Sequence, residues 1–202
     1  MATIIEDGSG QGFSCKVDKE NRLYTRAVSE NEFEHAVRKG RAFNVNTEFI
    51  TINTAGENAI LYIKNNGDED IVLTGWFIGT GDPNGSTSGV GPLVKTYYNP
   101  TGGTIVSGAN NVTLVNRQAG SSETFDVVAY KATGSGETIT GAISTPVLFQ
   151  IQPSAGRVFG NVYLALKKGA SLGVVFDLGG LTSAQIYTGF QGFKPETFNF
   201  GE

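Results

Sequence analysis

Residues Asn58–Gly81 read NAILYIKNNGDEDIVLTGWFIGTG and carry the strongest local structural signal in the chain. Two apolar runs, Ala59–Lys64 and Ile71–Ile78, flank a polar turn. The Asn66-Gly67 pair in that turn supplies the positive φ angles that a tight reversal requires, so the stretch predicts a β-hairpin. The second run is apolar at nearly every position, which predicts a strand covered on both faces.

The whole-chain composition favours one globular domain. The 202 residues are 39% hydrophobic, which is enough to build a core, and the 28 glycines separate apolar runs, as turns between short strands do. The net charge of −4 and the lack of a long basic cluster disfavour nucleic-acid binding. The single cysteine, Cys15, excludes an internal disulfide and a CxxC metal site. No run of 18 apolar residues predicts a membrane helix, and the first residues do not resemble a signal peptide, so we expect synthesis in a reducing cytoplasm.

One short helix is predicted at about Glu30–Lys39. Ser29 and Glu32 form a capping box, and Gly40 is a suitable C-terminal cap. The apolar stripe of this helix consists of Phe33, Ala36 and Val37.

The rest of the chain predicts a mainly β fold. The expected strands are Ala42–Asn46, Glu48–Asn53, Leu93–Tyr98, Thr104–Val106, Asn111–Asn116, Thr124–Lys131 and Ala184–Phe193, besides the two runs quoted above. Alternation in Val158–Lys167 and Leu172–Leu178, around a Lys168-Gly169 turn, predicts a second hairpin. Strands with glycine turns and no crossover helices indicate an antiparallel β-sandwich, either jelly-roll-like or immunoglobulin-like. The expected organisation is an N-terminal arm, residues 1–18, and one sandwich domain, residues 19–202.

No pattern predicts catalysis or a cofactor. Gly79, Gly81 and Gly85 have the wrong spacing for a phosphate loop and precede no helix, so they predict a flexible loop. The 85–89 segment, GSTSG, lacks the strand–elbow–helix context of a serine nucleophile. His35 is the only histidine and is expected on the surface of the helix, and the Asp68–Asp70 carboxylates are expected to be solvated. The chain is therefore expected not to be an enzyme and to bind no metal.

Aromatic residues offer one weak binding signal. Trp76 lies within an apolar run and is expected in the core. Tyr97 and Tyr98 could contact a glycan, although adjacent strand residues face opposite sides. A carbohydrate-binding adhesin module is thus one alternative function.

The sequence resembles virion structural proteins of tailed bacteriophages. The resemblance is carried by EDGSGQGFSCKVDKENRLYTRAVSENEFEHAVRKGRAFNVNT at 6–47, by AILYIKNNGDEDIVLTGWFIG at 59–79 and by GRVFGNVYLALKKGASLGVVFDL at 156–178. These motifs are structural and not catalytic, and together they cover most of the chain in pattern.

The resemblance implies a non-enzymatic capsid decoration or cement protein with a jelly-roll-like sandwich, located on the virion surface. It implies the major capsid protein as a partner and a homo-oligomer, with a trimer favoured, and no nucleic acid or membrane. By position, the arm Ala2–Asp18 would contact the capsid or a neighbouring subunit; its apolar residues are Ile4, Ile5, Phe13 and Val17. A tail or baseplate adaptor is the alternative within the virion.

Overall fold

The computed structural model describes residues 31–85, 91–107, 110–141, 143–150 and 157–196, and at 107, 143–150 and 157 it describes the backbone alone. The chain divides into two compact units, Met1–Asn31 and Glu32–Glu202. All but one of the described residues belong to the second unit. The predicted arm, residues 1–18, lies outside the described residues, so the domain boundary after residue 18 stays a prediction.

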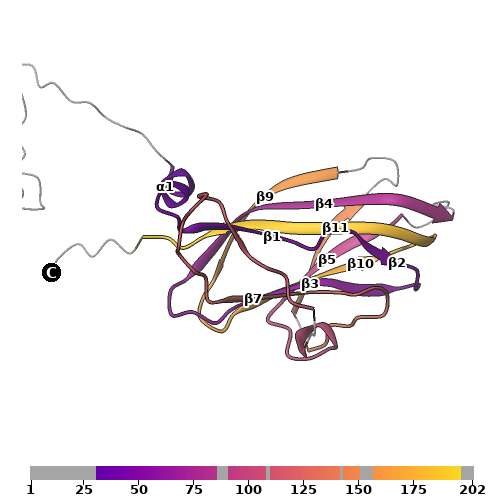
Figure 1. Cartoon of the computed structure of the whole chain (residues 1–202). Coiled ribbons are helices and arrows are strands. Elements are labelled where there is room, and N and C mark those ends of the chain that lie inside the picture. The colour runs from indigo at the N-terminus through magenta and orange to yellow at the C-terminus, as the bar shows by residue number, and fades with distance from the viewer. Residues whose placement is uncertain (1–30, 86–90, 108–109, 142, 151–156, 197–202) are drawn as a thin grey trace, which may run out of the picture. The chain divides into compact units, whose positions relative to one another are not determined.

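The described chain is built almost entirely from strands (Figure 1). Its elements are α1 (Glu32–Arg38), β1 (Ala42–Asn46), β2 (Ile50–Ile52), β3 (Glu57–Asn65), β4 (Ile71–Gly85), β5 (Leu93–Tyr98), the 3-10 helix η1 (Ile105–Ser107), β6 (Val115–Asn116), β7 (Val127–Lys131), β8 (Ile143–Gln150), β9 (Arg157–Leu166), β10 (Ser171–Asp177) and β11 (Leu181–Phe193). The mainly β prediction is confirmed.

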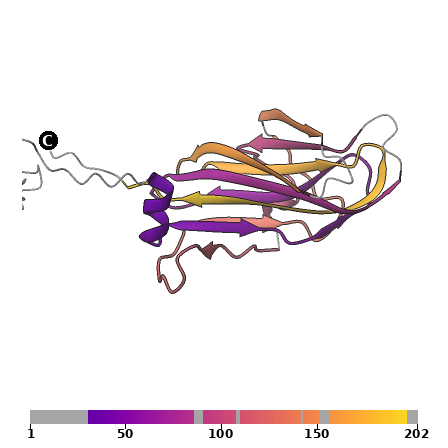
Figure 2. The same cartoon turned by 90° about the horizontal axis from the view of Figure 1, so that it is seen from above.

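The strands form two antiparallel sheets. One has the order β6-β1-β11-β4-β9, with β2 also paired to β11, and the other has the order β7-β3-β10-β5-β8. Strand β11 is the centre of the first sheet, because β1 and β2 follow one another along one side of it and β4 pairs with the other side. Figure 2 shows these strands from above, with α1 across one end of them.

The two sheets pack against each other as a β-sandwich does. Phe43 and Phe190 of the first sheet and Val94 and Phe176 of the second are almost fully buried in one shared cluster. A second cluster covers the outer face of the five-stranded sheet; it contains Ala59, Tyr62, Ile105 and Val175. Strand β3 is therefore covered on both faces.

A short polar network within the core joins β4, β11 and Thr47, the residue that follows β1. Trp76 is 4% exposed, stacks on Phe190 with ring centroids 6.0 Å apart, and donates its indole N–H to Thr188 Oγ1 at 2.8 Å. The Thr188 hydroxyl in turn donates to the Phe77 carbonyl at 2.9 Å. The backbone N–H of Thr188 donates to Thr47 Oγ1 at 2.9 Å. The core position predicted for Trp76 is confirmed.

Both predicted hairpins are wrong in their pairing. Strands β3 and β4 form where the apolar runs were recognised, but β3 pairs with β7 and β10, whereas β4 pairs with β9 and β11. Strands β9 and β10 likewise lie in different sheets. The residues of a turn determine that the chain changes direction. They do not determine whether the two strands on either side of the turn hydrogen-bond to each other. Here each turn carries the chain across the sandwich from one sheet to the other.

The helix ends as predicted. Gly40 has φ of +72°, and its N–H donates to the Val37 carbonyl at 3.1 Å while the Arg41 N–H donates to the Ala36 carbonyl at 2.8 Å. These two bonds form a Schellman motif, which requires the left-handed backbone that glycine adopts at little cost. The predicted stripe packs against Ala42 and Phe193. Ser29, half of the predicted capping box, lies outside the described residues.

Several other predicted elements are shifted or replaced. Gly79 and Gly81 do not form a loop, because β4 continues as a strand to Gly85. Residues 104–106 were expected to be a strand, but η1 forms at Ile105–Ser107. The strand predicted at 111–116 shrinks to the two residues of β6, and β8 was not predicted. The bounds predicted for β1 and β5 are confirmed.

Candidate functional site

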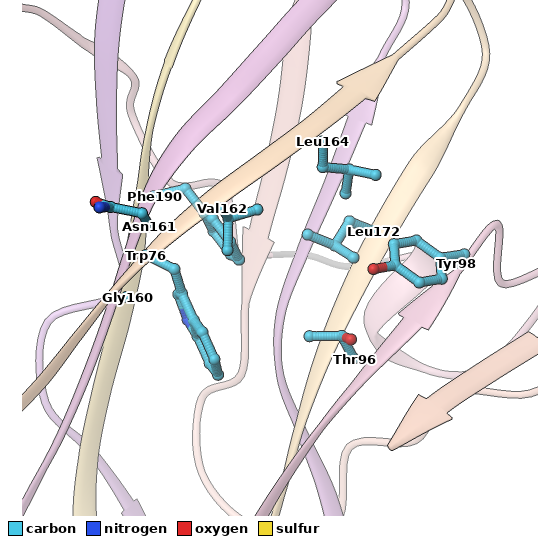
Figure 3. A pocket seen from close by; sticks show the side chains of 9 residues that line it. All are labelled: Trp76, Thr96, Tyr98, Gly160, Asn161, Val162, Leu164, Leu172 and Phe190. Atoms are coloured by element: carbon cyan, nitrogen blue, oxygen red, sulfur yellow. The ribbon is translucent and has the colours of Figure 1, made fainter. Parts of the chain in front are cut away.

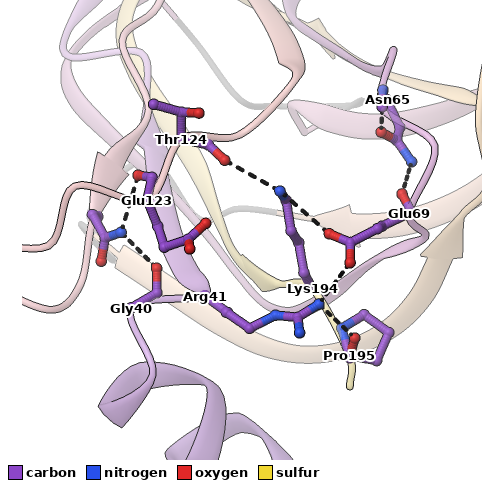
Figure 4. Close-up of polar contacts among 10 residues, drawn as sticks. Gly40, Arg41, Asn65, Glu69, Glu123, Thr124, Lys194 and Pro195 are labelled. Carbon is purple, nitrogen blue, oxygen red and sulfur yellow. Dashed lines mark hydrogen bonds and ion pairs between the residues drawn. The ribbon is translucent and has the colours of Figure 1, made fainter. Parts of the chain in front are cut away.

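The acidic turn at the β3–β4 corner is bonded to neighbouring segments rather than merely solvated (Figure 4). Arg41 Nη2 donates to Glu69 Oε1 at 3.1 Å and to the Pro195 carbonyl at 2.9 Å. Lys194 Nζ lies 3.4 Å from Glu69 Oε2 and donates to the Thr124 carbonyl at 3.2 Å. These contacts connect the corner to the start of β1 and the end of β11.

The same corner is held from inside by an amide side chain. Asn65 is buried, and its Nδ2 donates to the carbonyls of Glu69 at 2.9 Å and Leu166 at 2.8 Å. Its Oδ1 accepts the Gly67 N–H at 3.0 Å. Asp68 forms an ion pair with Lys168, whose hydrogen bond and charge hold the pKa of the Asp68 carboxyl below its ordinary value. The ion pairs of Glu69 with Arg41 and Lys194, and of Asp68 with Lys168, give this corner a structural role.

A small pocket lies between the sheets near β9 (Figure 3). Its volume is about 140 Å³. The lining residues are Trp76, Thr96, Tyr98, Gly160, Asn161, Val162, Leu164, Leu172 and Phe190. The lining is mostly apolar, with polar groups from Thr96, Tyr98 and Asn161, and it contains no carboxylate, histidine, lysine or cysteine.

The two tyrosines predicted as glycan contacts face opposite sides of β5. Tyr98 packs against the inter-sheet core and lines the pocket, whereas Tyr97 packs against the cluster on the outer face. The two rings therefore cannot stack on one sugar, and a glycan contact by either stays a prediction.

Tyr97 belongs to a polar cluster on the outer face of the five-stranded sheet. Its hydroxyl donates to Glu57 Oε2 at 2.6 Å, and Lys95 forms an ion pair with the other Glu57 oxygen. Burial and the hydrogen bond to the Glu57 carboxylate raise the pKa of Tyr97 to about 12. Burial works to raise the pKa of Glu57, but the bonds from Lys95 and Tyr97 outweigh it and the pKa is lowered. This arrangement stabilises a carboxylate and does not prepare one as a base.

A row of aromatic rings crosses the outer face of the first sheet. We call Phe49, Tyr187, Phe77 and Phe159 the aromatic row. Its successive ring centroids are 4.8, 6.2 and 6.2 Å apart, with interplanar angles of 69°, 46° and 50°. Phe49 and Phe159 are 63% and 64% exposed. Alternation could have located two of these rings in the sequence, because Phe77 lies between the inward-facing Trp76 and Ile78, and Phe159 follows Val158.

The residues predicted for capsid or subunit contact are Ile4, Ile5, Phe13 and Val17, and all four lie outside the described residues. Most of the GSTSG segment is also outside them. His35 lies on α1, with its Nε2 3.2 Å from Glu196 Oε1, and it is half-buried rather than fully on the surface as predicted.

Within the described part of the chain, no group of three or more His, Cys, Asp or Glu side chains is arranged to hold a metal ion. None of its helices is long and apolar enough to cross a membrane. In comparisons with known proteins, no family model, curated protein or solved structure matches this chain.

Proposed function

We propose that this chain is a non-enzymatic structural protein of a tailed-phage virion, and that it decorates and stabilises the capsid shell as a jelly-roll sandwich. The observation that supports this most is the strand order of the two sheets. Leaving aside the short β2 and the insertion β6–β7, the sheets have the orders β1-β11-β4-β9 and β3-β10-β5-β8. Six of the seven connections between these eight strands cross from one sheet to the other, as expected for the two Greek keys of a jelly roll, an architecture common in viral capsid proteins and lectins.

The choice of a virion role within that architecture comes from the sequence resemblance, because a fold by itself hosts many functions. The site chemistry is compatible with it. The described ionisable clusters at Glu57 and Glu69 form ion pairs and hydrogen bonds that stabilise the fold, and the inter-sheet pocket is small and apolar. A cement protein needs broad contact surfaces rather than a cleft.

The test is to determine the position and number of copies of this protein in purified particles. Quantitative mass spectrometry should give hundreds of copies per particle, and cryo-electron microscopy should place them on the outer shell. A particle assembled without the protein should lose its DNA at a lower temperature and recover on addition of the purified chain. A copy number of a dozen or fewer would instead assign the protein to the tail or baseplate, and absence from particles would reject both virion roles.

A glycan-binding module is the second candidate, and the aromatic row is the observation that favours it. Exposed rings on a sheet face are suited to stacking on the apolar faces of sugars. The angles of 46–69° between successive rings argue against a flat platform. A glycan array tests this function. Binding by the wild-type chain that is lost in Phe159→Ala would support glycan binding, and no binding by the wild-type chain would reject it. Tyr97→Ala and Tyr98→Ala test the residues predicted from the sequence in the same assay.

A further inference from the structure

The edges of the two sheets are protected unequally. Strands β6 and β2 are only two and three residues long, β7 ends in Lys131, and β8 contains Pro146. Short length, lysine and proline are the devices by which proteins prevent an edge strand from pairing with another chain. Strand β9 has ten residues and contains neither a charge nor a proline between Val158 and Leu166.

Strand β9 is also apolar where it meets solvent. It forms one edge of the first sheet and pairs with β4, and among the described strands it has no second partner (Figure 1). Tyr163 and Phe159 alternate with the inward-facing Val158 and Val162 and are 86% and 64% exposed. A strand of this kind is suited to pair with an added strand. Its backbone N–H and C=O groups can form the hydrogen bonds of a β-ladder, and its exposed side chains can contact those of the added strand.

Charge indicates which strand would fit. Arg157 opens β9 and Lys167 follows it, so both ends of the edge are basic. Two β9 strands paired antiparallel about their centres would bring these like charges together, which disfavours β9–β9 pairing. The complementary strand is apolar in the middle and acidic at an end.

The segment Ala2–Asp7 of this chain, ATIIED, has that character. Thr3, Ile4 and Ile5 are β-branched, and Glu6 and Asp7 follow them, so the acidic pair meets a basic end of β9 in either strand direction. The 24 residues from Gly8 to Asn31 reach up to roughly 80 Å when extended, which is far enough to serve a neighbouring molecule.

We propose that Ala2–Asp7 of a second copy of this chain adds to the edge of β9 that no described strand pairs. The edge and the segment are different surfaces of the chain, so the contact is heterologous. The trimer of the proposed function is the case in which the rotation between successive copies closes into a ring. This inference rests on the self-association included in the proposed function, and it needs no capsid. Its failure is therefore distinguishable from the failure of the virion role, which is decided by copy number in particles.

The test places a photo-cross-linking amino acid, p-benzoylphenylalanine, at Tyr163 of the full-length chain. Irradiation should give a species of twice the chain mass on a denaturing gel, and tryptic mass spectrometry should identify peptide Met1–Lys16 as the partner of position 163. The matched control carries the same group at Val115, which is 60% exposed on β6 at the opposite edge of the same sheet. Cross-linking at 115 to that peptide should be absent.

A proline scan of the segment gives an independent readout. Ile5→Pro removes a ladder N–H, so the cross-linked species should fall about tenfold and light scattering should show a shift to a single-chain mass. Ser9→Pro, just beyond the segment, should leave both unchanged. A link formed within one chain, a link to any other peptide, equal cross-linking at 115, no cross-link at 163, or an unaffected Ile5→Pro oligomer would each overturn the proposal.

Discussion

At the scale of single residues, Thr188 shows how the core tolerates polar groups. Its side chain is fully buried, but its hydroxyl accepts the Trp76 indole N–H and donates to the Phe77 carbonyl. A buried donor costs little free energy when it is paired and much more when it is left unpaired. The tryptophan can therefore pack between the sheets without an unsatisfied nitrogen.

Replacing Thr188 with valine keeps the volume and removes the hydroxyl that accepts the Trp76 indole N–H. We expect Thr188→Val to lower the free energy of unfolding by about 1–3 kcal/mol. Urea denaturation followed by Trp76 fluorescence measures this. Thr182→Val changes an exposed threonine of the same strand and should stay close to wild type. Equal stability of the two variants would show that the hydroxyl does not stabilise the core.

Tyr97 gives the fold a pH dependence in the alkaline range. An unfolded tyrosine releases its proton near its ordinary pKa of 10.0, whereas in the folded chain the pKa of Tyr97 is raised to about 12. Between these values the native state holds more protons than the unfolded state, so the stabilisation from Tyr97 is complete below pH 10 and is lost as pH rises toward 12. The loss of stability across this range should be smaller in Tyr97→Phe than in wild type.

Urea midpoints measured at intervals from below pH 10 upward test this, and only the difference between the two proteins is interpreted because other groups titrate as well. Tyr163→Phe is the control, since it removes a hydroxyl from a side chain that is 86% exposed. Parallel profiles for Tyr97→Phe and wild type would contradict the effect of the Glu57 carboxylate.

At the scale of elements, local signals predicted where strands and turns form but not which strands pair. The Lys168-Gly169 turn forms, and the chain also reverses after Asn66-Gly67, but neither Asn66 nor Gly67 has the positive φ that the sequence predicted. Each reversal joins strands of different sheets. Turn chemistry depends on a few adjacent residues, whereas pairing depends on side chains far away in sequence. The buried Asn65, which bonds the Leu166 carbonyl 101 positions away, is a contact of that second kind. Strand alternation was readable for the same local reason, so Val158 and Val162 were assigned correctly to the buried face.

Close packing across β11 depends on a glycine. A Cβ at Gly189 would collide with the Val45 carbonyl oxygen and with the Phe77 ring, whose Cε1 would lie 2.9 Å away. Gly189→Ala should therefore destabilise the fold by about 1–3 kcal/mol through overpacking. Gly160→Ala on β9 is the matched control, because a Cβ there meets nothing within 4 Å. Thermal unfolding of both variants tests this. A Gly189→Ala protein as stable as Gly160→Ala would contradict the claim that β11 is packed too closely at Gly189 to accept a Cβ.

For the candidate surfaces, the sequence was informative only about single strands. It predicted that Tyr97 and Tyr98 face opposite ways, because alternation is a local rule. The aromatic row could not be predicted from the sequence, because Phe49, Tyr187 and Phe159 come from segments that are far apart in the chain. Their neighbourhood follows from the strand order and not from any spacing in the sequence.

At the scale of the whole molecule, stability should decrease from the centre of the first sheet to its edges. Strand β11 pairs along both sides, whereas β6 has two residues. We expect hydrogen exchange to be slowest in peptides from β11 and fastest, among the described strands, in β6. Mass spectrometry of exchanged and digested protein measures this. Exchange in β6 as slow as in β11 would mean that the sheet opens only as a unit.

The central position of β11 also has a consequence for the order of events during synthesis. Strand β1 is synthesised well before β11, with which it pairs, because β11 begins at Leu181, 135 residues after Asn46. At typical rates of translation this interval is on the order of ten seconds. Throughout it, Phe43, Val45 and the apolar face of β4 have no strand to complete their sheet. The period of greatest aggregation risk for this protein is therefore its own translation, and chaperone supply and growth temperature should govern the soluble yield.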